Sequence, residues 1–288
     1  MTNILSVDVE DYFQVQAFSG QVHRSLWDTY SSRVEANTLQ LLDLFDELAV
    51  NATFFILGWV AERYPALVKQ IVARGHELAC HSYWHRPIFE LSPDEFREDT
   101  RKAKDIIEQI GGIKVTGYRA PSFSIMVKSF WALDILAELE FSYDSSIFPV
   151  RHDFYGVPNA PRTPFVINTE SGPLIEYPMT TFSLGKRLNL PVGGGGYLRI
   201  FPEWYTRFGV NQVWKEQRPM IIYVHPWEVD PEQPRLAGPL KSRLRHYTNL
   251  AKTKQRLSKL IQSGSFSSFQ NSGLAAGATP YDIRGVNQ

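Results

Sequence analysis

Short apolar runs alternate along the chain with stretches in which apolar residues recur at helical spacing. One predicted helix has clear ends: Ser92 and Glu95 form a capping box around Pro93, and the pattern stops at Gly111. The alternation is typical of β/α units around a parallel sheet. The apolar runs that predict strands are residues 4–9, 52–57, 76–80, 115–118, 141–143, 174–177 and 220–224.

Seven or eight such units in 288 residues predict an α/β fold. The pattern favours a closed or partly open barrel, with functional residues at the carboxyl ends of the strands. The composition is that of an ordinary globular protein, with 43% hydrophobic residues and zero net charge, so nothing in it points to nucleic acid. The single cysteine, Cys80, cannot form an internal disulfide. We read no signal peptide and no membrane span, and therefore expect a cytoplasmic protein.

Three segments are expected along the chain. Residues 1–230 form the barrel, including a mobile glycine-rich rim loop at 193–196; residues 231–265 form a basic helical extension packed on it; residues 266–288 form a flexible tail. The basic residues of the stretch 235–259 most simply form a solvated helix face. The alternative is peripheral contact with an anionic partner, such as a membrane surface or a lipid-linked saccharide.

Three acidic residues, Asp8, Glu10 and Asp11, end the first predicted strand. Alternate residues of a strand share a face, so Asp8 and Glu10 can point the same way. Three acids at one strand end repel each other and need a cation or hydrogen bonds in compensation. A solvated acidic loop is the alternative interpretation.

Two histidines, His81 and His85, follow the third predicted strand. Histidines four residues apart in a helical turn lie on one face and can chelate one metal ion. The spacing alone is weak, and two unrelated histidines would explain it equally well. Because both lie at a strand end, as the acids do, two histidines and one carboxylate predict a catalytic metal site with room for water.

Arg119 and His225 end two further strands. An arginine there can be simple surface charge, or it can hold a carboxylate such as Asp8 and keep it ionised as a base. His225 follows the buried run at 220–224, where it is either a capped core residue or a general acid.

The four motifs together resemble the NodB-homology polysaccharide deacetylases, carbohydrate esterase family 4. That family has an acidic motif on strand one, H-[ST]-x-x-H on strand three, R-x-P on strand four and a histidine after a late strand. The order matches across residues 4–227. The segments at 6–13, 191–196, 225–231 and 245–249 further resemble the exosortase-associated (PEP-CTERM locus) branch.

The resemblance implies a distorted, TIM-like (β/α)7-type barrel and a divalent metal ion, usually zinc. Asp8 would then deprotonate the attacking water, Arg119 would orient Asp8, and His225 would protonate the leaving amine. His81 and His85 would bind the metal.

The oxyanion would be held by the metal and by a backbone N–H just after Pro121, here that of Ser122. The family's usual aromatic residue after R-x-P is replaced by Ser122, with Phe123 one place later.

The acidic motif departs from the family pattern of two adjacent aspartates, because Val9 follows Asp8. From the shared strand face, Glu10 is the expected carboxylate ligand of the metal, and Asp11 is the alternative.

The fourth motif of the family, which contains tryptophan, is not evident either. Asp144 takes roughly its place and is expected to pair with His225, raising its pKa. Glu176 is the rival for that role.

Aromatic residues flank the motifs and can line a sugar groove: Trp84, Phe123 and Trp227 lie beside them, and Tyr197 follows the glycines. Core packing is an equally good interpretation of these rings. Together the features predict hydrolysis of N-acetyl groups on a glycan, an exopolysaccharide or its precursor. The alternatives are an allantoinase-like cyclic amide hydrolase on the same scaffold and a non-catalytic sugar-binding module.

Overall fold

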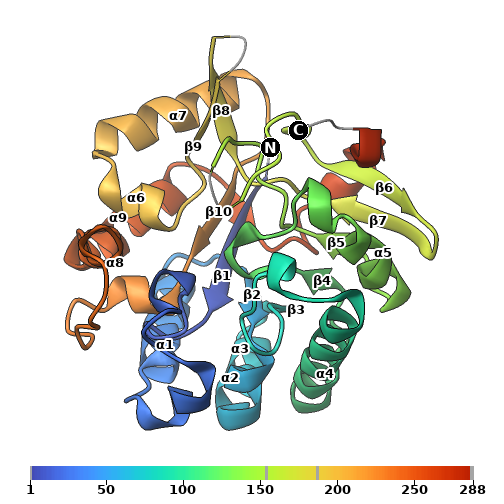
Figure 1. Cartoon of the computed structure of the whole chain (residues 1–288). Helices are drawn as coiled ribbons and strands as arrows, with labels where there is room; N and C mark the ends of the chain where they lie inside the picture. Colours follow the sequence, from blue (N-terminus) through green and yellow to red (C-terminus); the bar gives the residue numbers. More distant parts are fainter. Residues whose placement is uncertain (1, 153–154, 186–187, 286–288) are drawn as a thin grey trace.

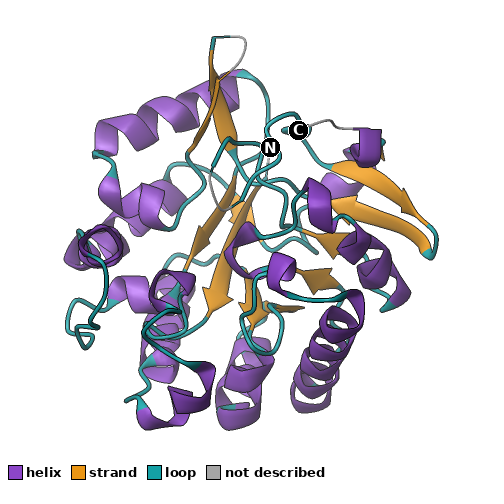
Figure 2. Ribbon diagram, in the orientation of Figure 1, coloured by secondary structure: helices purple, strands orange, loops and turns teal. Residues whose placement is uncertain are grey.

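The structure is a computed structural model that describes residues 2–152, 155–185 and 188–285. A mostly parallel sheet lies at its centre, with helices around it (Figures 1 and 2). The strands are β1 (Asn3–Val9), β2 (Thr53–Ile56), β3 (Glu77–Cys80), β4 (Gly117–Tyr118), β5 (Tyr143–Asp144), β6 (Phe165–Thr169), β7 (Gly172–Glu176), β8 (Thr181–Leu184), β9 (Leu188–Pro191), β10 (Ile221–Val224), β11 (Phe266–Ser267) and β12 (Thr279–Pro280).

In Figure 1, helices α6 to α9 gather on the left of the sheet, and α4 and α5 lie on its right. The helices are α1 (Val34–Glu47), α2 (Gly58–Arg63), α3 (Pro65–Ala73), α4 (Pro93–Gly111), α5 (Trp131–Glu138), α6 (Gly196–Ile200), α7 (Glu203–Lys215), α8 (Leu240–Tyr247) and α9 (Leu250–Gln262). Three short 3₁₀ helices border the site described below: η1 (Gln16–Phe18), η4 (Pro121–Phe123) and η6 (Pro226–Val229).

The strand order among the described residues is β10-β1-β2-β3-β4-β5-β7-β6-β12, with β11 also paired to β1. All seven strands predicted from the apolar runs are present, and their mutual pairs are parallel. The α/β fold of the prediction is confirmed. Among the described residues, the strand pairs form an open path rather than a ring. Thr180, which follows β7 in the sequence, hydrogen-bonds through its hydroxyl to the backbone of Ile221 in β10.

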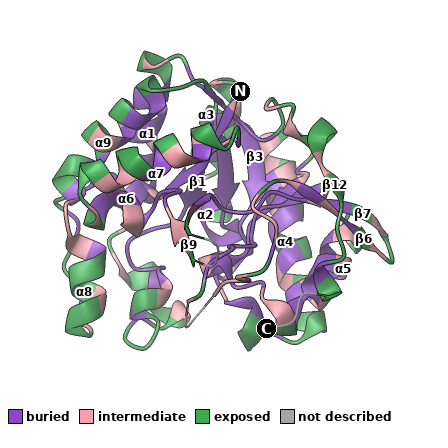
Figure 3. Cartoon of the chain, turned by 90° about the horizontal axis from the view of Figure 1, so that it is seen from above, coloured by how far each residue is buried: buried purple, intermediate pink, exposed green. Residues whose placement is uncertain are grey.

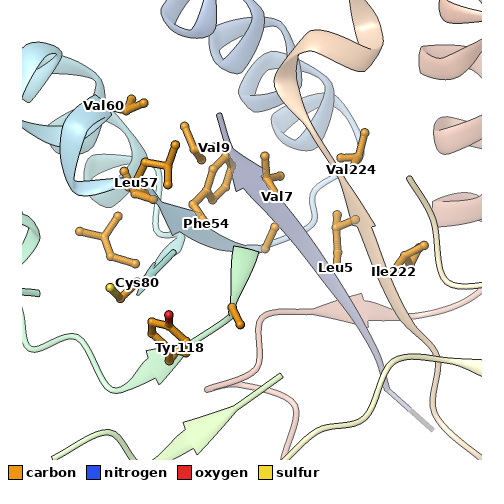
Figure 4. Packing of buried hydrophobic residues seen from close by; sticks show 14 of the residues in the cluster. Leu5, Val7, Val9, Phe54, Leu57, Val60, Cys80, Tyr118, Ile222 and Val224 are labelled. Carbon is orange, nitrogen blue, oxygen red and sulfur yellow. The ribbon is translucent and has the colours of Figure 1, made fainter. Parts of the chain in front are cut away.

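Strand β1 shows why the sequence places polar groups inside this sheet. Side chains alternate between faces, so Leu5, Val7 and Val9 pack outward in the larger hydrophobic cluster, beside β10 (Figure 4). Ile4 lies in a second cluster on the inner face, and Asp8 follows it at an even spacing. The inner face therefore carries the chemistry, while the outer face holds the helices.

The predicted capping box is present at the start of α4. The Ser92 hydroxyl accepts from the Glu95 backbone N–H at 3.3 Å, and the Ser92 backbone N–H donates to the Glu95 carboxylate at 2.9 Å. The helix ends at Gly112 in the left-handed conformation, as expected from the glycine stop.

The glycine-rich segment, predicted as a mobile rim loop, lies against β10 and reaches the cleft at Gly196. Gly194 bridges to Tyr223 of β10, and the backbones of Gly193 and Gly195 bond to Tyr223 at 2.8 and 2.9 Å. A Cβ at position 194 would lie 2.0 Å from the carbonyl oxygen of Tyr223. The glycines are there because the backbone lies directly against β10.

The C-terminal segment, predicted as a flexible tail over residues 266–288, contributes two short strands to the sheet. Over its described part, to residue 285, β11 pairs with β1 and β12 with β6. Phe269 is 2% exposed and packs against Phe55, Tyr143 and Tyr177 on the inner side of the sheet. The segment thus plugs the end of the sheet opposite to the site.

The basic extension is helical, as predicted, and comprises α8 and α9. Arg256 has a structural role, because its guanidinium donates to the carbonyls of Leu198, Arg199 and Phe201. The outer faces of these helices are exposed, whereas the central strands are buried (Figure 3). In the described part of the chain, no helix has the length and apolarity needed to cross a membrane.

Candidate active site

A cleft of about 440 Å³ lies where β1, β3, β4 and β10 end. Parallel strands bring their carboxyl ends to one edge, so segments far apart in the sequence meet there. Of the residues proposed from the sequence, those in its wall are Asp8, Glu10, His81, His85, Ser122, Phe123, His225 and Trp227.

Glu10, His81 and His85 form a buried cluster in which one ligand atom from each lies within 4.8 Å of the others. The His85 Nε2 atom is 2.7 Å from the Glu10 carboxylate. Burial raises the pKa of Glu10, but the charges of His85 and His225 and its bond to His85 together lower it to about 2. A carboxylate that stays ionised beside two imidazoles is the donor set of a zinc site.

The hydrogen bonds of the cluster fit a metal ion. His81 donates its Nδ1 proton to the Arg119 carbonyl at 2.7 Å, which leaves Nε2 with a lone pair for an ion. Burial lowers the pKa of His81 to about 4, so the ring is neutral near pH 7. Glu10 Oε2 has its close contact with His85 Nε2, and His85 Nδ1, among the described residues, is buried without a hydrogen-bond partner. The residues present therefore suit a divalent ion.

Asp11, the alternative ligand, is held elsewhere. Its Oδ2 accepts from the Ser32 hydroxyl at 2.6 Å and from the backbone N–H groups of Arg33 and Val34 at 2.8 and 3.1 Å. These groups begin α1, so Asp11 caps that helix from a distance.

Asp8 and Arg119 meet on the inner side of the sheet, both buried. One guanidinium nitrogen of Arg119 donates to Asp8 Oδ1 at 2.7 Å and to Ser6 at 2.8 Å. The guanidinium also lies 4.1 Å from the centre of the Phe55 ring. Asp8 Oδ2 is 3.9 Å from His225 Nε2. One oxygen of Asp8 is thus tied to arginine, and the other faces the cleft.

His225 is oriented by Glu228, a residue the sequence analysis did not single out. Its Nδ1 donates to Glu228 Oε1 at 2.5 Å, which turns Nε2 toward Asp8 and Glu10. Burial lowers the pKa of His225, but the charge of Glu10 and the bond to Glu228 raise it to about 9. His225 is therefore cationic near neutral pH.

The predicted pairing of His225 with Asp144, or with its rival Glu176, is wrong. Asp144 bonds to the Ser146 hydroxyl at 2.5 Å and shares a hydrogen bond with Glu176. Burial raises the pKa of Asp144 to about 6 and raises that of Glu176 as well. Two buried carboxyls side by side share a proton, whereas Glu228 reaches His225 through the i,i+3 spacing of η6.

Arg199 holds Glu228 in turn. It is 1% exposed, and its Nε bonds to Glu228. Its Nη1 donates to the carbonyls of Arg245, His246 and Thr248 at 3.2, 2.9 and 2.9 Å. The turn between α8 and α9 is thereby linked to the catalytic histidine candidate. A buried arginine in the run 197–201 offered no signal in the sequence.

Backbone strain gathers around the cleft. Ser82, His85, Ser122 and Phe123 all have positive φ, between 51° and 66°, which L-residues rarely adopt. Ser122 and Phe123 lie in the cleft wall, while Pro121 is buried behind them. Such conformations cost energy and persist where the surrounding structure enforces them, typically at functional sites.

The aromatic residues divide between cleft and core. Trp227 lies in the wall, donates its indole N–H to Glu10 at 3.1 Å and stacks on His225. Trp84 instead packs against Trp27, with ring centroids 5.9 Å apart.

Tyr197 lies one layer behind the cleft. Its hydroxyl bonds at 2.5 Å to that of Tyr155, and it is Tyr155, which the sequence did not single out, that reaches the wall.

Comparison with known proteins identifies two parts of the chain. Residues 21–142 match the family model "Polysaccharide deacetylase". Residues 145–273 match a "Domain of unknown function (DUF3473)".

Curated relatives of the chain include two peptidoglycan deacetylases. The peptidoglycan-N-acetylglucosamine deacetylase of Bacillus cereus is 33% identical over 98 residues, which cover 34% of this chain and 36% of that protein. The peptidoglycan-N-acetylmuramic acid deacetylase PdaC of Bacillus subtilis is 35% identical over 86 residues, 30% of this chain and 18% of that one. The chain therefore spans only about a third or less of these relatives.

The fold is shared over nearly the whole chain. A crystal structure of a candidate polysaccharide deacetylase from Mycobacterium smegmatis superposes with a TM-score of 0.62, at 17% identity, and covers 98% of this chain and 94% of that one. Fold and site together define an α/β protein with a buried cluster, Glu10, His81 and His85, that could hold a metal ion. Residues 21–142, which match the polysaccharide deacetylase family model, include His81, His85 and Arg119 of the site.

Proposed function

We propose that this protein hydrolyses the N-acetyl group of a glycan, releasing acetate and leaving a free amine. One observation carries the proposal: the Glu10, His81 and His85 ligand atoms lie within 4.8 Å of one another, beside Asp8 and His225. A divalent ion held there, zinc by its preference for this donor set, would polarise the amide carbonyl and acidify water.

Asp8 serves as the base in this proposal. Arg119 holds Oδ1 and fixes the plane of the carboxylate, so Oδ2 is the atom that accepts a proton from the attacking water. His225 is the acid: its Nε2 lies 3.9 Å from that oxygen, so base and acid flank one reaction centre. Glu228 stabilises the imidazolium that gives its proton to the departing amine.

The oxyanion would be met by a backbone donor. The Ser122 residue lies in the cleft wall with φ 55°, a conformation that turns its peptide differently from a regular strand or helix. We assign its N–H to the developing oxyanion. A pre-positioned donor of this kind typically contributes 10²- to 10³-fold to the rate.

The glycan we propose is an exopolysaccharide or its precursor. Support comes from the sequence segments at 6–13, 191–196, 225–231 and 245–249, which resemble the exosortase-associated branch of the family. The exposed lysines of the basic extension, Lys241, Lys252 and Lys254, would contact an anionic membrane surface or lipid-linked saccharide.

Acetate release tests the proposed function. Zinc-loaded protein should release acetate from N-acetylglucosamine oligomers, lose that activity on chelation and regain it with zinc. Asp8→Asn should keep the metal by elemental analysis yet lose about 10²- to 10⁴-fold in kcat. Asp105→Asn, an exposed site on α4, is the matched control and should behave as wild type.

Two outcomes would overturn the proposal. Ring opening of cyclic ureides without acetate release would assign an allantoinase-like activity. Oligomer binding with no turnover by the metal-loaded protein would assign a sugar-binding module.

A further inference from the structure

One face of helix α8 forms part of the cleft wall. Ser242, Arg245 and His246 line the cleft, and their spacing places them on one side of the helix. Arg243, between them in the sequence, lines a separate surface pocket. The helix therefore presents Arg245 to the cleft and Arg243 away from it.

Arg245 carries a positive charge that the cleft does not compensate. The two carboxylates in the wall are both engaged, Asp8 by Arg119 at 2.7 Å and Glu10 by His85 at 2.7 Å. Arg245 is exposed, and no carboxylate of the described residues forms an ion pair with it. The mouth of the cleft is therefore electropositive and would repel a cationic ligand.

The position of Arg245 is built into the fold. Its carbonyl accepts from Arg199 Nη1 at 3.2 Å, and the same Arg199 bonds through Nε to Glu228. Its side-chain stem lies close to Gly196, where a Cβ would be 4.0 Å from the Arg245 Cγ. One buried arginine thus holds both the partner of His225 and the backbone that carries Arg245.

The wall also carries neutral polar groups. They include Gln16, which begins η1, Ser19, which follows it, and Tyr155. Amides and hydroxyls suit the hydroxyl groups of a sugar, whereas a guanidinium suits a carboxylate or a phosphate. Within this wall Arg245 is the group that would distinguish charged from neutral glycans.

We propose that Arg245 binds an anionic group carried by the glycan next to the N-acetylated sugar, such as a uronic acid carboxylate or a phosphate. This inference rests on the proposed function, because it assigns the substrate class of the same cleft. The reaction turns a neutral amide into a cationic amine, and the uncompensated charge of Arg245 would favour entry of the anionic substrate over retention of the aminated product.

Matched glycans test the assignment with the zinc-loaded protein. There are three probes: a hyaluronan tetrasaccharide, in which glucuronic acid alternates with N-acetylglucosamine; the neutral, fully N-acetylated chitotetraose; and N-acetylglucosamine 1-phosphate. Calorimetric binding and initial rates are measured for each. Arg245→Gln should raise the Kd and KM of the anionic probe by about tenfold, leaving kcat and all chitotetraose constants unchanged. Arg245→Lys should restore part of the loss.

Arg243→Gln is the control, since it removes the same charge from the same helix outside the cleft, and it should change nothing. A loss confined to hyaluronan identifies a carboxylate, and a loss confined to the phosphate probe identifies a phosphate. If Arg245→Gln weakens chitotetraose equally, or weakens neither anionic probe, the inference is wrong. Absence of acetate release from every probe would instead refute the proposed function, because the binding measurements do not depend on turnover.

Discussion

At the scale of single residues, the site is a set of charges that hold one another in place. Arg119 ties one oxygen of Asp8, Glu228 ties His225, and Arg199 ties Glu228. The Arg119–Asp8 and Arg199–Glu228 pairs are buried, and a buried charge is tolerated only when it is paired and hydrogen-bonded. Removing one partner therefore changes the state of the other.

The alkaline limit of activity should depend on Glu228. The acid His225 must be protonated to act, so activity is lost as pH rises through its pKa, which the hydrogen-bonded Glu228 carboxylate raises. Glu228→Gln removes a raising charge, so the alkaline limb of the kcat profile should move to lower pH and kcat should fall about tenfold or more. The exposed Glu232→Gln is the control. An unmoved limb would show that Glu228 has only a structural part.

Variants of Glu10 and Asp11, the two candidate carboxylate ligands of the metal, should differ in zinc content and in stability. Glu10→Gln should lose bound zinc, measured by elemental analysis, because it removes the one carboxylate of the three-residue cluster. Asp11→Ala should retain zinc but lower stability by about 1–2 kcal/mol, because it uncaps α1. Zinc loss in Asp11→Ala without loss of thermal stability would reverse the assignment.

At the scale of elements, close backbone contact decides what sequence alone left open. The glycines at 193–195 lie against β10 and pair with it through backbone contacts at Tyr223. Because β10 leads directly into His225, this contact supports the position of the acid candidate.

Gly194 and Gly172 can separate two energetic costs of adding a side chain: backbone strain from a positive φ, and steric contact with neighbouring atoms. Gly194 and Gly172 have similar φ, +124° and +130°, but only Gly194 faces backbone at 2.0 Å; nothing lies within 4 Å of a Cβ at 172. Gly172→Ala should cost about 1–2 kcal/mol through φ alone. Gly194→Ala should cost roughly 3 kcal/mol or more in denaturant unfolding. Equal losses would mean that the contact with Tyr223 contributes nothing.

At the scale of the whole molecule, the chain closes on itself at the end opposite to the cleft. The C-terminal segment adds β11 beside β1 and places Phe269 among the rings of the inner cluster. The family model that ends at residue 142 therefore describes only part of the folded unit.

This closure predicts that the last residues are needed for stability. Phe269→Ala should destabilise the protein by about 3–5 kcal/mol, because the ring is 2% exposed and stacks on Tyr143 at 5.0 Å. Leu274→Ala, at a less buried position of the same segment, should cost less. Thermal melting measures both losses. A wild-type melting temperature in Phe269→Ala would contradict the stabilising role of the C-terminal segment.

The local patterns of the sequence carried much of this picture. Strand periodicity placed Asp8 and Glu10 on one face, and strand ends collected His81, Arg119 and His225. These features follow from the period of two in a strand and from the shared edge of parallel strands, both of which are local.

Tertiary structure decided the rest, because it depends on which distant segments meet. Asp11 hydrogen-bonds to the start of α1, so Glu10 is the carboxylate that lies beside the two histidines. Arg199 forms an ion pair with Glu228, which is distant in the sequence, and the segment after residue 265 packs on the inner face of the sheet. No spacing along the chain encodes these pairings; they arise from register and packing, which exist only once the chain has folded.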